Sequence, residues 1–224
     1  MRANRLVPIF GLGYTGADEI CLPNAKECAG LQTGSPTTSS SDEPSGGPIL
    51  VTGATGFLGG HLVRTLLQQG RPVRATGRNL EIGLDLAAAG ADFRPVDLTD
   101  RPAMLEVCRG VDIVVHSGAL SSAWGKYRDF YDINVSGTQN VVDGCLLHGV
   151  KRLVHISSPS VLSRHEPQFD LNDETPLPGT FVSMYSETKA MAEKVVEEAA
   201  GKGLETVILR PKAIYGPGDN AIFP

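Results

Sequence analysis

Short apolar runs alternate with amphipathic stretches from residue 48 to the end of the chain. The apolar runs are mostly continuous, a pattern typical of strands that are buried on both faces of a sheet. They predict strands at residues 49–52, 72–76, 91–96, 111–116, 152–157 and 205–210. Helical periodicity lies between them, for example at residues 57–69, 128–147 and 185–200. Strands that alternate with helices predict an α/β fold, in which a doubly wound parallel sheet carries helices on both faces.

The beginning of the chain has a different composition. Residues 31–48 read LQTGSPTTSSSDEPSGGP and are rich in Ser, Thr, Pro and Gly. Such a segment cannot bury enough apolar surface to offset the entropy that is lost on ordering it. We therefore expect residues 1–47 to be a disordered or irregular N-terminal extension with a linker, and residues 48–224 to form one domain.

Two glycine-rich stretches could each form the turn that binds a dinucleotide pyrophosphate. The first, GLGYTG at residues 11–16, has the literal G-x-G-x-x-G spacing. However, Pro8 interrupts the strand that should precede it, and Pro23 would end the following helix after about two turns. The second, TGATGFLG at residues 52–59, follows an apolar strand and begins a helix with a leucine stripe. Only the second offers a helix N-terminus to a phosphate group, so it predicts a Rossmann-type cofactor site.

Tyr185 and Lys189 are the strongest candidates for chemistry. They are four residues apart in MYSETKAMAEKVVEE, so a helix places them on one face. A lysine ammonium beside the phenol favours phenolate, and we expect it to lower a tyrosine pKa that starts near 10. Tyr185 could then exchange a proton with a substrate oxygen near neutral pH.

With these two motifs, residues 48–224 resemble the extended short-chain dehydrogenase/reductase superfamily, the group of NAD-dependent epimerases and dehydratases. The resemblance implies that Ser158, in SSPSV, hydrogen-bonds the substrate carbonyl or hydroxyl, with Ser157 and Ser160 as the nearest alternatives. It also implies that Asn134 supports Lys189 through its backbone and a water molecule. Asn134 and Ser158 thereby join the tyrosine and the lysine in a catalytic tetrad.

The resemblance further implies a nicotinamide cofactor and the residues that hold it. The second strand ends in VRATGRN, which offers Arg74 and Arg78 and no acid. An arginine there takes the 2'-phosphate of NADP and a carboxylate takes the ribose hydroxyl of NAD, so NADP is favoured and NAD remains an alternative. The implied cofactor-binding residues are Gly53, Thr55, Gly56, Phe57, Leu58, Gly59, Arg78, Asp97, Leu98, Ser117, Gly118, Ala119, Tyr185, Lys189 and Pro211.

The stretch ALSSAWG at residues 119–125 resembles the 3β-hydroxysteroid dehydrogenase branch, particularly the bacterial 2-alkyl-3-oxoalkanoate reductases of olefin synthesis. This implies hydride transfer that reduces a ketone, or oxidises a secondary alcohol, on an apolar 3-oxoalkanoate or sterol-like substrate. A sugar-nucleotide epimerase is an alternative, because it shares the tetrad. Members of the family continue past the point where this chain stops, so we expect the C-terminal substrate region to be missing. A dinucleotide-binding fragment without turnover is therefore a further alternative.

Charge and composition limit the kinds of partner that we expect for this chain. The net charge is -5, and Lys and Arg are scattered along the chain, which argues against nucleic acid and anionic membranes. No apolar segment is long enough to span a bilayer. The four cysteines have no metal-ligand spacing, so we expect buried thiols and no metal site. We expect a cytoplasmic enzyme with a small-molecule substrate, and the resemblance implies a homodimer built from the helices near residues 128–147 and 185–200.

Overall fold

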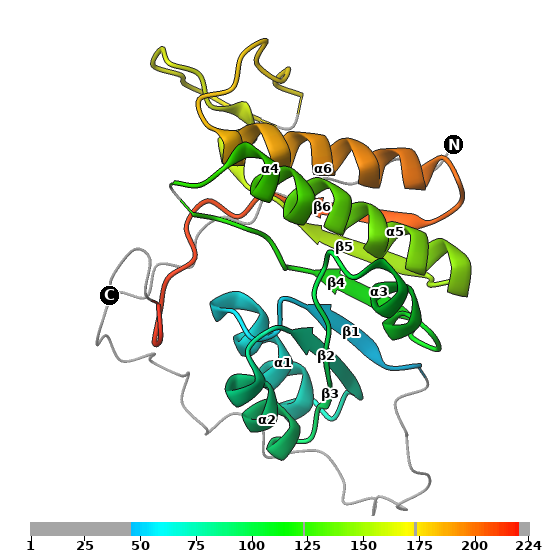
Figure 1. The fold of residues 1–224 in the computed structure, drawn as a ribbon. Coiled ribbons are helices and arrows are strands. Elements are labelled where there is room, and N and C mark those ends of the chain that lie inside the picture. Colours follow the sequence, from blue (N-terminus) through cyan, green and yellow to red (C-terminus); the bar gives the residue numbers. More distant parts are fainter. Residues whose placement is uncertain (1–45, 123, 173, 220–224) are drawn as a thin grey trace, which may run out of the picture.

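Six parallel strands form the centre of the computed structural model, which describes residues 46–219 except 123 and 173 (Figure 1). The strands lie in the order β3-β2-β1-β4-β5-β6. Strands β2 and β3 are therefore added on one side of β1, and β4, β5 and β6 on the other, so the strand order reverses between β1 and β4. This order is that of a Rossmann fold and confirms the predicted fold class. The strands are β1 (Ile49–Thr52), β2 (Val73–Gly77), β3 (Asp92–Pro95), β4 (Ile113–His116), β5 (Arg152–Ile156) and β6 (Glu205–Leu209).

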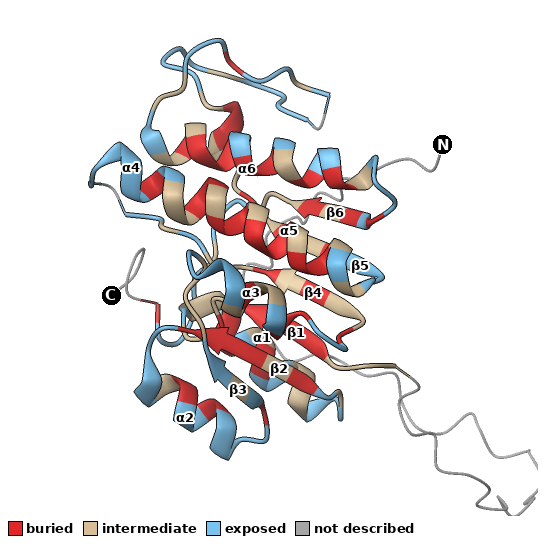
Figure 2. Cartoon of the chain, turned by 45° about the vertical axis from the view of Figure 1, so that its right-hand side comes forward, coloured by how far each residue is buried: buried red, intermediate tan, exposed pale blue. Residues whose placement is uncertain are grey.

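Helices cover both faces of the sheet, because successive strand residues point to opposite sides. Val51 packs with α1 (Phe57–Gln68) and α2 (Leu80–Ala88), whereas Leu50 packs with the helices of the other face. The strands β1 and β2 and the inward sides of the helices are buried, whereas β3 at the edge of the sheet is mostly exposed (Figure 2). Burial on both faces accounts for the continuous apolar runs of the central strands. The helices of the second face that share this core are α3 (Arg101–Val107), α5 (Gly137–His148) and α6 (Met184–Ala200).

The helix predicted over residues 128–147 is interrupted. It begins as α4 (Tyr127–Phe130), continues as a π-helix, η1 (Tyr131–Ser136), and only then becomes α5. A π-helix inserts an extra residue into a turn, which the 3.6-residue periodicity of the sequence does not reveal. Two further helices, α2 and α3, were not predicted from the sequence. Both are short helices that begin at a side-chain cap, Asn79 accepting from Ile82 N and Asp100 from Ala103 N.

Several sequence-based predictions lie at the edges of the described residues. The extension 1–47 lies almost entirely outside them, as do the first glycine stretch at residues 11–16, Cys21 and Cys28. Cys108 and Cys145 are buried free thiols, as expected. Within residues 46–219, none of the helices has the length and apolar character that crossing a bilayer requires.

Candidate active site

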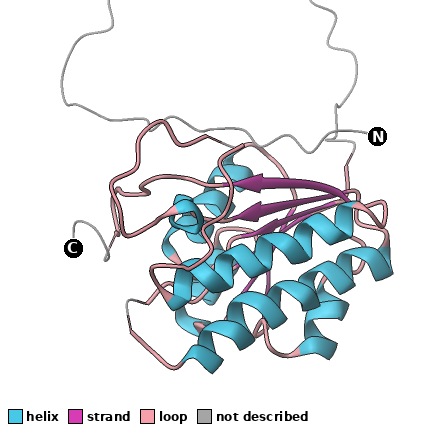
Figure 3. Ribbon diagram, turned by 90° about the horizontal axis from the view of Figure 1, so that it is seen from above, coloured by secondary structure: helices cyan, strands magenta, loops and turns pink. Residues whose placement is uncertain are grey.

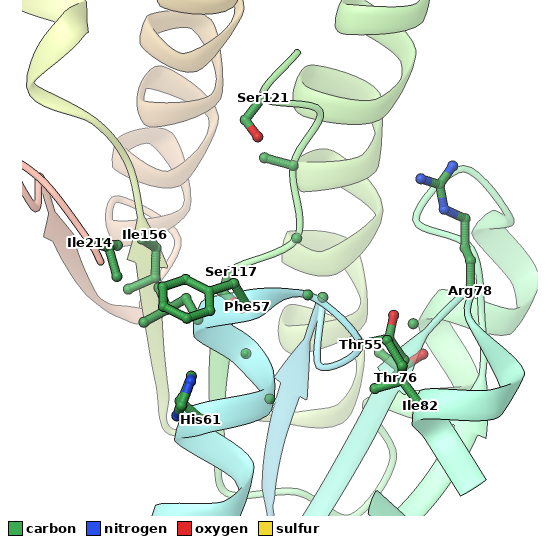
Figure 4. A pocket seen from close by; sticks show the side chains of 18 of the residues that line it. Thr55, Phe57, His61, Thr76, Arg78, Ile82, Ser117, Ser121, Ile156 and Ile214 are labelled. Carbon is green, nitrogen blue, oxygen red and sulfur yellow. The ribbon is translucent and has the colours of Figure 1, made fainter. Parts of the chain in front are cut away.

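A cavity of about 1030 Å³ opens at the carboxyl ends of the strands. In Figure 3 the strand arrows point the same way, and loops lie beyond the arrowheads. The cavity spans the place between β1 and β4 where the strand order reverses, which is where open α/β sheets bind ligands. Figure 4 shows Arg78 towards one end of this cavity and Ile156 with Ile214 towards the other, with Phe57 and Ser117 between them.

The glycine turn after β1 lies close to the loop that follows β4 and to the first turn of α1. Gly53 has a positive φ of 66°, and a Cβ there would lie 2.5 Å from the Cα of Gly118. A Cβ on Gly59 would lie 2.3 Å from the carbonyl oxygen of Gly53. Gly56 caps α1 without a side-chain hydrogen bond, and the first turn contains no acid. The N–H groups of this helix N-terminus are therefore available to an anion such as a pyrophosphate.

The structure brings together nearly all of the residues expected to hold the cofactor. Every one of them lines the cavity except Pro211, which lies just after β6. Sequence reasoning missed His61 and Arg64, which also line it. Their spacing of four and seven residues from Phe57 places them on one helix face, and the rings of Phe57 and His61 meet edge-on at 5.0 Å. Helical spacing could therefore have identified them.

The two arginines of the second strand have different environments. Arg78 lies at the cavity, is exposed, and approaches Asp97 with its Nη1 3.7 Å from Oδ2. Burial tends to raise the pKa of Asp97, but hydrogen bonds from Thr99 and the charge of Arg78 outweigh it and lower that pKa below its ordinary value. Arg74 instead donates to Asp92 at 2.8 Å and to two main-chain carbonyls at and just beyond the C-terminal end of α3. Arg78 is thus the arginine that could reach a ligand.

Tyr185 lies in the first turn of α6, where Ser183 and Ser186 form a capping box. Burial raises the pKa of Tyr185, and a hydrogen bond with Ser158 only partly opposes this. The expectation that Lys189 lowers the tyrosine pKa is therefore wrong for this structure. The physical reason is that the phenol is largely removed from water, while the lysine ammonium is held elsewhere. Tyr185 is a neutral phenol at neutral pH.

Ser158 ends the segment after β5 and begins a short 3-10 helix, η2 (Pro159–Leu162). Its Oγ accepts from the N–H of Ser160 at 3.2 Å and from the Ser160 hydroxyl at 2.9 Å. Ser158 therefore caps a turn and also contacts Tyr185. Ser158 is not among the residues that line the cavity, whereas the alternative Ser157 is, and the other alternative, Ser160, is held by Ser158.

Lys189 is buried one turn further along α6. Its Nζ donates to the carbonyl oxygen of Ile156 at 2.7 Å and lies 3.3 Å from Nε2 of His155. Burial lowers the pKa of Lys189 to about 8, although the carboxylate of Glu193 acts in the opposite direction. Glu193 is itself held by a two-point ion pair with Arg210 after β6. Lys189 also lines the cavity, so its nitrogen could donate to a hydroxyl group placed there.

Asn134 lies in the π-helix and joins three elements. Its Oδ1 accepts from the N–H of Leu120 at 2.7 Å, and its Nδ2 donates to Leu120 O and to Oγ1 of Thr188. Its carbonyl oxygen accepts from Thr138 at 2.6 Å. Asn134 therefore fixes the loop after β4 against the residue that precedes Lys189.

Replacing Lys189 with methionine is expected to stabilise the fold at pH 7. The pKa of Lys189 is about 8 in the folded chain, against an ordinary value of 10.5, so the unfolded chain binds more protons between these pH values. Burying the charged ammonium therefore costs the folded state free energy. This cost is present in full below pH 8 and disappears above pH 10.5. The difference in unfolding free energy between K189M and wild type should shrink by about 3 kcal/mol from pH 7 to 10.5. Urea denaturation at several pH values measures it.

Lys194, which is exposed on the same helix, gives the matched control. The K194M variant makes the same chemical change at the surface, so comparison with it isolates the burial of Lys189. A K189M difference that does not shrink relative to K194M as the pH rises would contradict the lowered pKa of Lys189.

The cavity, its glycine turn, and a tyrosine and a lysine that line it from the same helix indicate a nucleotide-binding domain of the short-chain dehydrogenase/reductase kind. Residues 50–224 match the 3-beta hydroxysteroid dehydrogenase/isomerase family, and the chain belongs to that family. It is 43% identical over 178 residues to a 2-alkyl-3-oxoalkanoate reductase of Stenotrophomonas maltophilia, covering 79% of this chain and 53% of that protein. It is 36% identical over 174 residues to a dihydroquinoline-1-oxide ketoreductase of Stigmatella aurantiaca, covering 78% and 52%.

A solved structure shows the same architecture. A short-chain dehydrogenase/reductase superfamily protein from Agrobacterium tumefaciens with bound NAD aligns with a TM-score of 0.64 and 32% identity, covering 72% of this chain and 48% of that one. The chain thus spans about half the length of the relatives that it matches.

Proposed function

We propose that this chain is the cofactor-binding part of an NAD(P)-dependent oxidoreductase that reduces a ketone, or oxidises the corresponding alcohol, on an apolar substrate. The observation that carries the proposal is Tyr185, a neutral phenol that is hydrogen-bonded to Ser158 at the cavity that Lys189 also lines. The related proteins named as ketone reductases support the same reaction. We infer a 2-alkyl-3-oxoalkanoate or a similar apolar 3-oxo compound as the substrate class.

The residues present fit a nicotinamide dinucleotide. The α1 N-terminus and the turn at Gly53 suit a pyrophosphate, and Arg78 suits a phosphate on the adenosine ribose. Lys189 would hold the hydroxyls of the other ribose. Bound in this way, the cofactor supplies or accepts a hydride.

The protein's own residues then move the proton. Ser158 orients the substrate oxygen, and Tyr185 gives its phenolic proton to that oxygen when a ketone is reduced. In the opposite direction the phenolate takes the proton from the alcohol. A neutral phenol at neutral pH favours ketone reduction as the working direction, because the proton is already on the donor.

The test is an assay of NADPH oxidation by the full chain with a 2-alkyl-3-oxoalkanoate as substrate, run beside product analysis after incubation with UDP-glucose, because epimerisation consumes no NADPH. We expect ketone-dependent oxidation and no conversion of the sugar nucleotide. Conversion of UDP-glucose alone would overturn the proposal in favour of an epimerase. Cofactor binding without turnover on any ketone would identify a binding module instead.

We further propose that NADP is the preferred cofactor, and Arg78→Gln tests it. Loss of a charge-assisted hydrogen bond to the 2'-phosphate should weaken NADPH binding at least about tenfold, while NADH binding changes little. Titration by nicotinamide fluorescence measures both. Arg94→Gln is the matched control, because Arg94 is an exposed arginine that pairs with Asp92 and does not line the cavity. Equal weakening of NADPH and NADH by Arg78→Gln would contradict the assignment.

A further inference from the structure

Two buried histidines lie side by side beneath Lys189. His116 on β4 and His155 on β5 are register partners in the parallel sheet, and their ring centroids are 5.1 Å apart. Both side chains are fully buried. Figure 1 shows β4 and β5 as neighbours, and Lys189 reaches their layer from α6. The chemistry assigned to the cavity leaves both histidines without a role.

The hydrogen bonds of His116 fix its protonation state. The Thr138 hydroxyl donates to Asn134 O, so its oxygen can only accept from Nε2 of His116, at 2.9 Å. Nε2 therefore carries the proton, and Nδ1 accepts from the hydroxyl of Thr52 at 2.7 Å. Burial, aided by the charge of Lys189, lowers the pKa of His116 to about 3, in agreement with a neutral ring. His116 is locked in one tautomer.

His155 differs, because its ring has only one hydrogen-bond partner among the described residues. Its Nε2 lies 3.3 Å from Nζ of Lys189, whereas its Nδ1 is buried without a partner. Burial and the neighbouring charges hold the pKa of His155 well below its ordinary value, so this ring is neutral too. A neutral imidazole has one donor and one acceptor nitrogen, and nothing except Lys189 selects which is which.

Two arrangements satisfy the contact between His155 and Lys189. When the lysine is an ammonium, it donates to Ile156 O and to a bare Nε2, and Nδ1 of the histidine carries the proton. When the lysine is an amine, its lone pair can accept from a protonated Nε2, and Nδ1 is bare. The proton on Lys189 and the tautomer of His155 are therefore linked.

We propose that His155 is a positioning residue for Lys189, whose Nε2 accepts a hydrogen bond from the ammonium and, in the other tautomer, donates one to the amine. The histidine keeps the lysine nitrogen at the cavity in both protonation states. A charge-assisted hydrogen bond is the stronger of the two, so His155 favours the ammonium. The inference deepens the proposed function, because it rests on the role given there to Lys189.

The other titratable groups near Lys189 either favour its ammonium form or stay neutral. The carboxylate of Glu193 on α6 favours the ammonium form of Lys189, and Glu193 also forms an ion pair with Arg210. His116 stays neutral and keeps its own partners. Tyr185 lines the same cavity and is a neutral phenol near neutral pH. Among these groups, only His155 can change its donor pattern as Lys189 titrates.

The test is NMR spectroscopy of the unmutated full chain without cofactor, with labelled lysine and histidine. The ¹³Cε signal that disappears in Lys189→Met reports the protonation of Lys189, and ring ¹H–¹⁵N correlations report the tautomer of His155. We expect the lysine to titrate near pH 8 and the proton of His155 to move from Nδ1 to Nε2 with the same midpoint. A His155 tautomer that does not change across this titration would overturn the proposal.

Variants give the second measurement. His155→Phe should move the Lys189 midpoint about one pH unit lower, a tenfold change in the protonation equilibrium, because the acceptor is lost. His155→Gln supplies an amide oxygen as acceptor, so the Lys189 midpoint should return most of the way to the wild-type value. His165→Phe, at an exposed histidine, should leave the midpoint unchanged. Equal midpoints in wild type and His155→Phe would also refute the proposal. Neither measurement needs turnover, so a failed ketone assay leaves this test intact.

Discussion

The Tyr185→Phe variant is expected to lower kcat for ketone reduction by about 10²- to 10⁴-fold, the range that a positioned general acid contributes. In the proposed reaction the phenol is the proton donor, and phenylalanine keeps the ring and removes only the hydroxyl. The KM for the ketone should change much less, because Ser158, in its proposed role, would still orient the substrate oxygen. Steady-state kinetics with saturating NADPH separates the two constants.

The pH profile gives an independent check on the same residue. Burial raises the pKa of Tyr185, so the protonated form that reduction needs persists through neutral pH. The reduction rate should be flat there and fall only when the pH rises through this raised pKa. Tyr131→Phe is the matched control, because Tyr131 lies in the π-helix and does not line the cavity. A loss in Tyr131→Phe as large as that in Tyr185→Phe would remove the case for a proton donor.

The Gly59→Ala variant should lose most of its NADPH affinity, by about 100-fold or more, as expected when the pyrophosphate hydrogen bonds are lost together. Its new Cβ would lie 2.3 Å from the Gly53 carbonyl oxygen and 2.8 Å from the Cα of Ala54. Both neighbours are backbone atoms, so α1 must move away from the turn. That movement misdirects the N–H groups at the helix N-terminus.

Gly60→Ala makes the same chemical change one residue later in the helix. There the nearest atom is the flexible end of Arg64 at 3.2 Å, which can move aside. Fluorescence titration of both variants, with thermal unfolding to confirm the fold, separates a local collision from a general effect on the helix. Equal NADPH affinity in Gly59→Ala and Gly60→Ala would show that the close approach at the turn does not matter for binding.

The sequence was sufficient where local pattern and fold agree. Each predicted strand coincides with an observed one, although β3 is short and mostly exposed. The glycine stretch at residues 52–59 joins β1 to α1, because a strand and a helix flank it. Three-dimensional neighbours decide the rest. Arg74 and Arg78 look equivalent in VRATGRN, yet only the position of α3 shows that Arg74 is bound to main-chain carbonyls.

The electrostatics of the site could not be predicted for the same reason. The pKa of Tyr185 depends on how completely the fold buries the ring, which helical spacing to Lys189 does not reveal. The contact between His155 and Lys189 joins a strand and a helix that are 34 residues apart in sequence. The contact forms because the fold brings α6 against the end of β5, so no local motif in the sequence predicts it.

The π-helix at Tyr131–Ser136 holds one more residue than a regular α-helical turn would. Deleting a single residue there would let the backbone relax into a regular α-helix with α5 still in register with α4, so Val141 and Cys145 would stay in the core that they share with α3. Asn134, which lies in the wide turn, would lose its place against Leu120 and Thr188. The extra residue therefore serves the placement of Asn134 and not the packing of α5.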